Sequence, residues 1–118
     1  MIIQQEDFIK KTVENARGGE GSVEFCHVVQ GEDLPDNSSL CARVNLGPGD
    51  SVGYHIHEKD AEMYLVIEGE LEADDNHEQV KTLRPGDVMI TGGGKGHSLS
   101  NRTDKPAAIW AIIVESGQ

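Results

Sequence analysis

The feature that most constrains the fold is a series of short apolar or alternating runs that begins at Ser22 and continues almost to the end of the chain. Between the runs stand clusters of Gly, Pro, Asn and Asp, such as LGPGD, ADDNHEQ and LRPGD, which are typical of chain reversals. Short strands with this punctuation indicate an all-β sandwich or barrel rather than βαβ units. We predict strands at VEFCHVV, LCARVNL, VGYHIH, MYLVIEGELEA, KTL, DVMI, HSLS and AAIWAIIV.

The first 20 residues have a different texture and allow two interpretations. The apolar residues of QQEDFIKKTVENAR fall near one face of a short helix, which the following Gly-Gly pair would end. The same segment could equally form an extended arm. We therefore divide the chain into an N-terminal arm or short helix over residues 1–20 and a single β-barrel domain over residues 21–118.

Charge and composition exclude several classes of partner. The net charge is −11, and the ten Lys and Arg residues are scattered, which argues against nucleic acid and against anionic membrane surfaces. No apolar run has the length of a membrane span or the form of a signal peptide, so we expect a cytoplasmic protein. In a reducing cytosol we expect Cys26 and Cys41 to be free thiols or small buried residues rather than a disulfide.

The stretch HIHEKDAE predicts a metal site. On a strand, His55 and His57 point to the same face, because side chains alternate with a period of two. Glu62 follows after a short connection, and a tight hairpin would bring its carboxylate beside the two imidazoles. His97 follows the flexible GGGKG and is a fourth candidate. Such a mixed N/O set suits one divalent transition metal ion, Mn, Fe, Ni or Zn, with positions left for water or substrate. The alternative is a polar barrel mouth that binds nothing.

Two longer stretches resemble a known family. The run from Gly49 to Gly69, with HIH and a glutamate at the required spacing, resembles the first cupin motif. The run from Gly86 to Asn101 resembles the second, except that Gly92 stands where Pro is usual. The resemblance implies a small single-domain cupin, folded as a double-stranded β-helix or jelly roll. It also implies a metal ion inside the barrel, bound by the four residues named above.

Candidate ligand-binding residues follow from strand parity. Arg43 and Asn45 lie on one face of their strand, and if that face looks into the barrel, the Arg43 guanidinium could hold a substrate carboxylate. The alternative is that Arg43 faces solvent. Tyr64 could reach the site or serve in packing. We expect His27 to be a core or edge histidine.

The fold leaves the activity open between three hypotheses. The resemblance to oxalate-decarboxylase domains favours a metalloenzyme, a decarboxylase, dioxygenase or isomerase, that acts on a small anionic or carbonyl-containing metabolite. Asn45 stands where those enzymes place a substrate-binding arginine, and no catalytic residue can be assigned. The alternatives are a non-catalytic binding or sensory module and a cupin whose metal is structural. We also expect a homodimer that pairs through its sheet edges and N-terminal arm.

Overall fold

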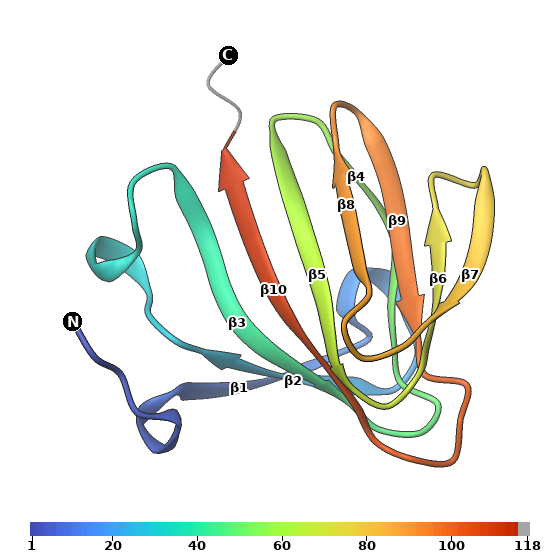
Figure 1. The fold of residues 1–118 in the computed structure, drawn as a ribbon, viewed down its shortest axis with the longest axis horizontal. Coiled ribbons are helices and arrows are strands. Elements are labelled where there is room, and N and C mark those ends of the chain that lie inside the picture. The colour runs from blue at the N-terminus through green and yellow to red at the C-terminus, as the bar shows by residue number, and fades with distance from the viewer. Residues whose placement is uncertain (116–118) are drawn as a thin grey trace.

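The structure, a computed structural model, describes residues 1–115, which form ten β-strands and three single-turn 3-10 helices (Figure 1). The helical turns are η1 (Gln5–Asp7), η2 (Ala16–Gly18) and η3 (Gly31–Asp33). The strands are β1 (Ile9–Glu14), β2 (Ser22–His27), β3 (Ser38–Leu46), β4 (Ser51–His57), β5 (Asp60–Glu68), β6 (Leu71–Asp75), β7 (Gln79–Leu83), β8 (Val88–Gly92), β9 (Lys95–Ser100) and β10 (Ala107–Glu115).

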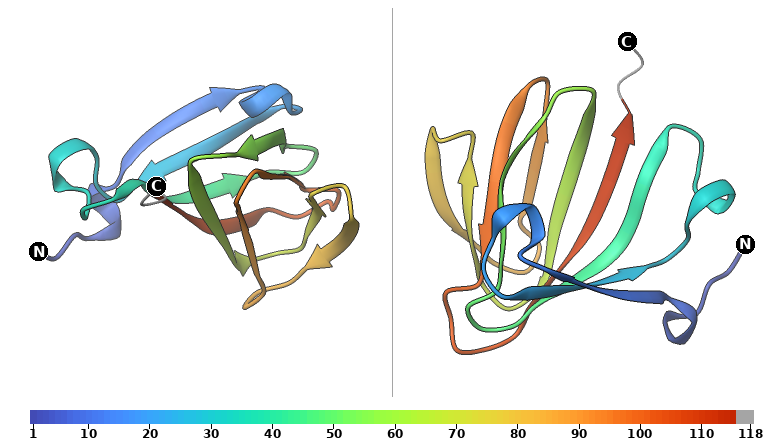
Figure 2. Two further views of the ribbon diagram at one scale, coloured as in Figure 1. Left: turned by 90° about the horizontal axis from the view of Figure 1, so that it is seen from above. Right: turned by 180° about the vertical axis from the view of Figure 1, so that it is seen from behind.

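The strands form two antiparallel sheets that face each other. One sheet has the order β1-β2-β3-β10-β5-β8 and the other the order β4-β9-β6-β7. Seen from above, the two sheets enclose a barrel, and the β1-β2 hairpin extends beyond it along one side (Figure 2). The predicted all-β barrel is therefore confirmed. None of the helical turns in residues 1–115 is long and apolar enough to cross a membrane.

The N-terminal segment is extended, so the helix alternative was wrong. Residues 9–14 form β1, which pairs along its whole length with β2 and places Val13 opposite Val23. A helix would leave the outer edge of β2 without hydrogen-bond partners, whereas a strand pairs it. The β1-β2 hairpin continues the larger sheet, and β1 lies within residues 1–20. The N-terminal segment is therefore part of the larger sheet.

Gly69 explains why one predicted run became two strands. The run MYLVIEGELEA is divided between β5, which lies in the larger sheet, and β6, which lies in the smaller one. Gly69 has a φ of 72°, and a Cβ at this position would come 2.4 Å from the Pro106 carbonyl oxygen. The chain can turn here between the sheets only because glycine has no side chain.

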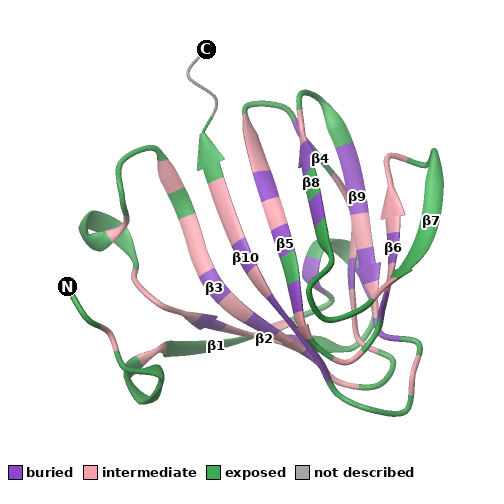
Figure 3. Cartoon of the chain, in the orientation of Figure 1, coloured by how far each residue is buried: buried purple, intermediate pink, exposed green. Residues whose placement is uncertain are grey.

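An apolar core fills the space between the sheets, and β3 shows how the sequence builds it. Ala42, Val44 and Leu46 alternate with outward residues and are completely or almost completely buried. Buried positions likewise alternate with more exposed ones along β5 and β8 (Figure 3). Both cysteines are free, as predicted, and burial raises the pKa of each thiol. The largest fully buried apolar side chains are Leu46, Leu71, Leu99, Ile109, Val23, Val44 and Val66.

Candidate metal centre and its cavity

Three strands bring together the four side chains that the sequence singled out. His55 and His57 come from β4, Glu62 from β5 and His97 from β9. His55 lies directly opposite His97 in the β4-β9 ladder, and His57 follows on the same face while Ile56 between them is exposed. One ligand atom from each of the four side chains lies within 4.8 Å of every other.

The connection between β4 and β5 is a corner rather than the tight hairpin that the sequence suggested. β4 pairs with β9 in the smaller sheet, whereas β5 pairs with β10 and β8 in the larger one. The chain crosses from one sheet to the other through Glu58 and Lys59. Glu62 therefore approaches the histidines from the facing sheet, which lets the four side chains surround a point instead of lining one surface.

The donor atoms of the cluster lie at the spacing of ligands around one ion. The Glu62 Oε1 atom is 3.0 Å from His57 Nε2, 3.1 Å from His97 Nε2 and 3.8 Å from His55 Nε2. The His97 Nε2 atom is 3.2 Å from His57 Nε2 and 3.1 Å from His55 Nε2. Two ligand atoms at right angles, each about 2.1 Å from an ion, are about 3 Å apart. The cluster matches this spacing closely.

Contacts on the far side of two rings orient their lone pairs toward the cluster. His55 Nδ1 donates a hydrogen bond to the Gly53 carbonyl oxygen at 2.8 Å, and His57 Nδ1 donates to Asp60 Oδ1 at 2.6 Å. Because the acceptors require a proton on Nδ1, each neutral ring carries its free lone pair on Nε2. Asp60 thus positions His57, a role the sequence interpretation missed. The sequence feature that could have predicted this role is the position of Asp60 three residues after His57.

The cluster is largely buried, and its electrostatics favour an ionised Glu62 carboxylate. Burial opposes ionisation of Glu62, but the hydrogen bonds that the His55 and His97 rings donate when protonated, and the positive charge of protonated His97 and His57, outweigh it and lower the pKa of Glu62 to about 2. Burial lowers the pKa of His97, although Glu62 partly opposes this. The His97 ring stacks on Tyr64 at a centroid distance of 4.6 Å. Burial and the Glu62 charge hold the pKa of Tyr64 well above its ordinary value.

This donor set fits a divalent transition metal ion. Three imidazole lone pairs and one carboxylate oxygen converge, and without a cation these electron-rich atoms repel one another. A single proton can relieve one such contact, whereas a divalent ion satisfies all four. Nitrogen-rich sets with one carboxylate suit Mn, Fe, Ni or Zn, and four protein ligands leave coordination positions for water or a ligand on an ion that takes six.

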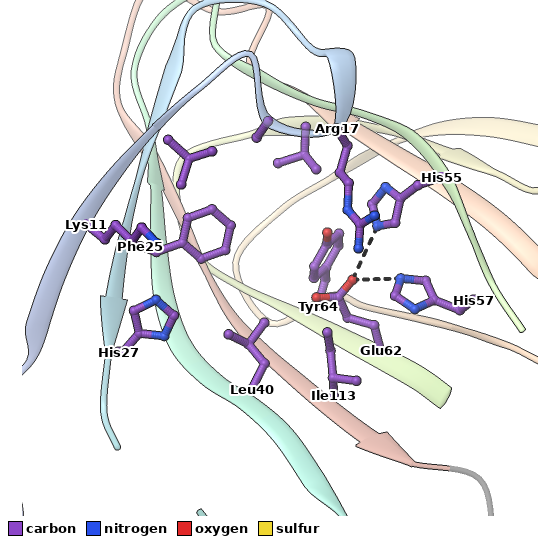
Figure 4. A pocket seen from close by; sticks show the side chains of 13 residues that line it. Lys11, Arg17, Phe25, His27, Leu40, His55, His57, Glu62, Tyr64 and Ile113 are labelled. Carbon is purple, nitrogen blue, oxygen red and sulfur yellow. Dashed lines mark ion pairs between the residues drawn. The ribbon is translucent and has the colours of Figure 1, made fainter. Parts of the chain in front are cut away.

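The cluster opens into a cavity of about 270 Å³ inside the barrel (Figure 4). The metal-cluster side contributes His55, His57 and Glu62, with Tyr64 beside them. The remaining wall comes largely from the N-terminal hairpin and is partly basic and partly apolar. Its residues are Lys11, Val13, Ala16, Arg17, Phe25, His27, Leu40, Val52 and Ile113. This volume lies just below the roughly 300 to 1,000 Å³ of typical ligand pockets, so the cavity has room for a small molecule.

Two of the three predicted ligand-binding residues lie elsewhere. Arg43 and Asn45 do share a face of β3, but it is the outer face, because the opposite parity carries the buried core residues. Arg43 pairs with Glu68 at 3.1 Å and donates to Asn45 Oδ1, while the Asn45 amide donates to Glu24. Parity arguments find residues on a common face but do not say which face is inside.

The third predicted ligand-binding residue, Tyr64, and the separately considered His27 both line the cavity. Tyr64 lines the cavity and stacks on His97, so it reaches the site as well as serving in packing. His27, expected in the core or at an edge, also lines the cavity, where its ring stacks on Phe25 at 5.9 Å. Burial lowers the pKa of His27.

The basic cavity residues Arg17 and Lys11 were missed by the sequence interpretation. Arg17 reaches the cavity from η2, where its φ is 52° and its ψ is 32°. This left-handed conformation is uncommon for a residue other than glycine, and no motif or periodicity predicts it. Lys11 alternates with Lys10 on β1, so an extended interpretation of this segment would have placed one of the two lysines inward.

Three histidines and a glutamate converge inside a two-sheet β-barrel, an arrangement typical of barrels that bind a metal ion. Comparison with known proteins identifies the family. The model of the cupin domain matches residues 42–114. The chain belongs to the cupin family. Both cupin motifs described above lie within the matched segment, whereas β1, η2 and β2 lie outside it.

One relative matches over nearly the whole chain. An oxalate-binding protein of Thermotoga maritima is 34% identical over 114 residues, which cover 97% of this chain and 93% of that protein. A crystal structure from the same organism, described as a predicted oxalate decarboxylase, superposes with a TM-score of 0.92 at 33% identity. It covers 98% of this chain and all of that one.

More distant matches have lower sequence identity or cover less of the matched protein. A germin-like protein of Oryza sativa subsp. japonica is 30% identical over 106 residues, which cover 82% of this chain but 46% of that protein. The KdgF structure from a Halomonas species superposes with a TM-score of 0.77 at 16% identity, covering 98% of this chain and 94% of that one. At that identity the likeness shows a common fold only.

Proposed function

We propose that this cupin binds one divalent transition metal ion through His55, His57, Glu62 and His97, and that the bound ion and the basic cavity wall together bind a small carboxylate anion. The observation that carries the proposal is the convergence of four donor atoms at ligand spacing on a cavity that also contains Arg17. When bound, the metal supplies concentrated positive charge that attracts a carboxylate oxygen.

The choice of a carboxylate rests on charge and on the relative. A chain of net charge −11 repels anions overall, so an anion can bind only where positive charge is concentrated. The cavity has that character, because a metal ion, the Arg17 guanidinium and the Lys11 ammonium group would all face it. The name of the Thermotoga relative, an oxalate-binding protein, supports oxalate as the first anion to test here.

The direct test combines elemental analysis with calorimetry. The purified protein is expected to contain close to one equivalent of Mn, Fe, Ni or Zn, or to take up one equivalent of Mn²⁺ after chelation. Titration of the Mn²⁺-loaded protein with oxalate is expected to show saturable binding, and the chelated protein is expected to bind oxalate much more weakly. Equal oxalate binding with and without metal would refute the proposal.

Catalysis at the same site is the second candidate function, and His27 favours it. His27 is a titratable group in the cavity that does not belong to the metal cluster, and burial lowers its pKa, so it is neutral and able to accept a proton near pH 7. Turnover of oxalate and related acids by the Mn²⁺- or Fe²⁺-loaded protein, compared with His27→Gln, separates a metalloenzyme from a binding or sensory module. Binding without turnover supports the module.

We also propose that two copies of the chain associate through the outer face of the larger sheet near its β8 edge. Leu65, Val88 and Ile90 are apolar and exposed on this face, at 37%, 51% and 67%, and β8 ends the sheet. Covering such a patch removes apolar surface from water and protects an edge strand. Light scattering tests this, with a dimer expected for the wild type and a monomer for Ile90→Glu. A wild-type monomer at micromolar concentration contradicts it.

A further inference from the structure

Arg17 differs from every other arginine of this protein. Arg43, Arg84 and Arg102 each pair with a glutamate, at 3.1, 3.1 and 3.0 Å. Within residues 1–115, Arg17 alone among the arginines has no acidic partner, although the chain has 21 acidic residues to 10 basic ones. Its guanidinium group is therefore available to an anion from outside the chain.

The Arg17 side chain is directed at the candidate metal centre. Figure 4 shows it extending from the η2 turn into the cavity, toward His55 and Glu62. Arg17, His55, Glu62 and Tyr64 all line the same cavity. An anion in the cavity could thus meet the metal ion and the guanidinium at once.

The backbone around Arg17 is held firmly in an unfavourable conformation. Asn15 and Arg17 both have left-handed φ values, 49° and 52°, a region that an arginine seldom adopts. The turn lies directly against β4, where a Cβ on Gly53 would come 2.1 Å from the Arg17 carbonyl oxygen, and a Cβ on Gly19 would come 2.3 Å from that of Ser51. Close contact with β4 therefore maintains the strain and sets the direction of the side chain.

Lys11 adds a second positive charge to the same wall. On β1, Lys11 and Val13 line the cavity, whereas Lys10 faces the outside of the sheet beside Glu24 and Arg43. Lys11 and Arg17, here named the cationic wall, both lie outside the segment that the cupin-domain model matches. The wall is thus a feature of this chain's N-terminal hairpin and is separate from the metal-binding motifs.

We propose that the cationic wall selects the ligand, making the cavity prefer small dianions with two acidic groups over monoanions of similar size. The inference rests on the proposed function, since the metal would hold one acidic group. Arg17 would receive the second, because a guanidinium donates two parallel charge-assisted hydrogen bonds to a carboxylate. The cavity has room for a short diacid between the metal cluster and the cationic wall.

The test measures anion preference in the Mn²⁺-loaded full-length chain by titration calorimetry at pH 7.5. Oxalate and malonate serve as dianions, with acetate and glycolate as monoanions. We expect the wild type to bind the dianions at least tenfold more tightly. Arg17→Gln should remove most of this preference, Arg17→Lys should retain part of it, and Lys11→Gln should reduce it less. Lys10→Gln, on the outer face, is the matched control and should behave as wild type.

Separate measurements distinguish the selective role of Arg17 from the proposed metal-dependent binding of anions. Metal content and melting temperature of Arg17→Gln should equal those of the wild type, because the side chain lies outside the metal cluster. If Arg17→Gln keeps the wild-type preference for dianions, the selective role of Arg17 is refuted while metal-dependent anion binding stands. If the Mn²⁺-loaded wild type binds none of the four anions, the proposed function itself fails.

Discussion

The two walls of the cavity are built by different means. The metal-cluster wall consists of buried side chains on paired strands, and His57, Glu62 and His97 are each at most 4% exposed. The cationic wall consists of exposed side chains, one of them on a strained turn. The first wall depends on mutual contacts among largely buried side chains, whereas the second depends on where the backbone places long, exposed side chains. The two walls should therefore respond differently to substitution.

The largest expected effect is the loss of a metal ligand. We expect His57→Ala to lower Mn²⁺ affinity more than a hundredfold, because the buried site loses one of its four candidate ligands, the His57 Nε2 lone pair. Equilibrium dialysis measures this directly. His77→Ala is the control, since His77 is an exposed histidine that pairs with Asp74 away from the cluster. Equal metal affinity in both variants would mean that the cluster is not the binding site.

A smaller effect is expected from the residue that positions His57. Asp60→Asn should lower metal affinity roughly tenfold to a hundredfold, because the carboxylate accepts the His57 Nδ1 proton and keeps the lone pair on Nε2. Glu58→Gln, an exposed acid in the same corner, should have little effect. If the two variants lose affinity equally, the general negative charge of the corner matters and the hydrogen bond does not.

Acidification should weaken metal binding at least tenfold between pH 7 and pH 4. Imidazoles must be neutral to bind, and their ordinary pKa is about 6.5. With its pKa lowered to about 2, Glu62 stays ionised, so the loss in this range reports the histidines. In the metal-free protein the same lowered pKa stabilises the fold above about pH 4.5, and this contribution disappears as the pH falls toward 2. Metal content and melting temperature against pH test both parts.

Gly53→Ala should affect the cationic wall more than the metal cluster. The new methyl group would overlap the Arg17 carbonyl oxygen, so η2 must move, at a cost of about 1–3 kcal/mol in unfolding free energy. We expect weaker oxalate binding and a smaller change in Mn²⁺ affinity. Gly47→Ala is the control, because a Cβ there meets only the flexible Asp50 side chain at 3.1 Å. A larger loss of metal affinity than of oxalate affinity would contradict this view of the two walls.

The smallest effect is expected on the outer face. Arg43→Gln breaks a partly exposed ion pair with Glu68 and should change the unfolding free energy by less than about 1 kcal/mol. Oxalate binding should not change, because Arg43 does not line the cavity. Chemical denaturation and calorimetry provide the two measurements. A marked loss of oxalate affinity would restore the role that the sequence suggested for Arg43.

Local patterns were enough to predict most of the β-strands and to find the cluster residues, but they did not predict β1 and did not separate β5 from β6. His55 and His57 lie on one face because of strand periodicity, which depends on the backbone alone. Arg43 shows the limit of the same reasoning, since periodicity assigned it correctly to a common face with Asn45 but could not choose the inner one. The helix considered for residues 4–17 shows a second limit, because pairing with β2 overrode an ambiguous local preference.

The sequence by itself determined which residues alternate and where the chain turns, because these follow from short-range geometry, and its resemblance to the two cupin motifs implied which imidazoles and carboxylate belong together. Only the tertiary structure decided that the β4-β5 connection is a corner between sheets and that the N-terminal hairpin forms the second wall of the cavity. The placement of Arg17 depends on close contact between η2 and Gly53, residues far apart in the chain. Such contacts arise when sheets close on each other, and no local pattern encodes them.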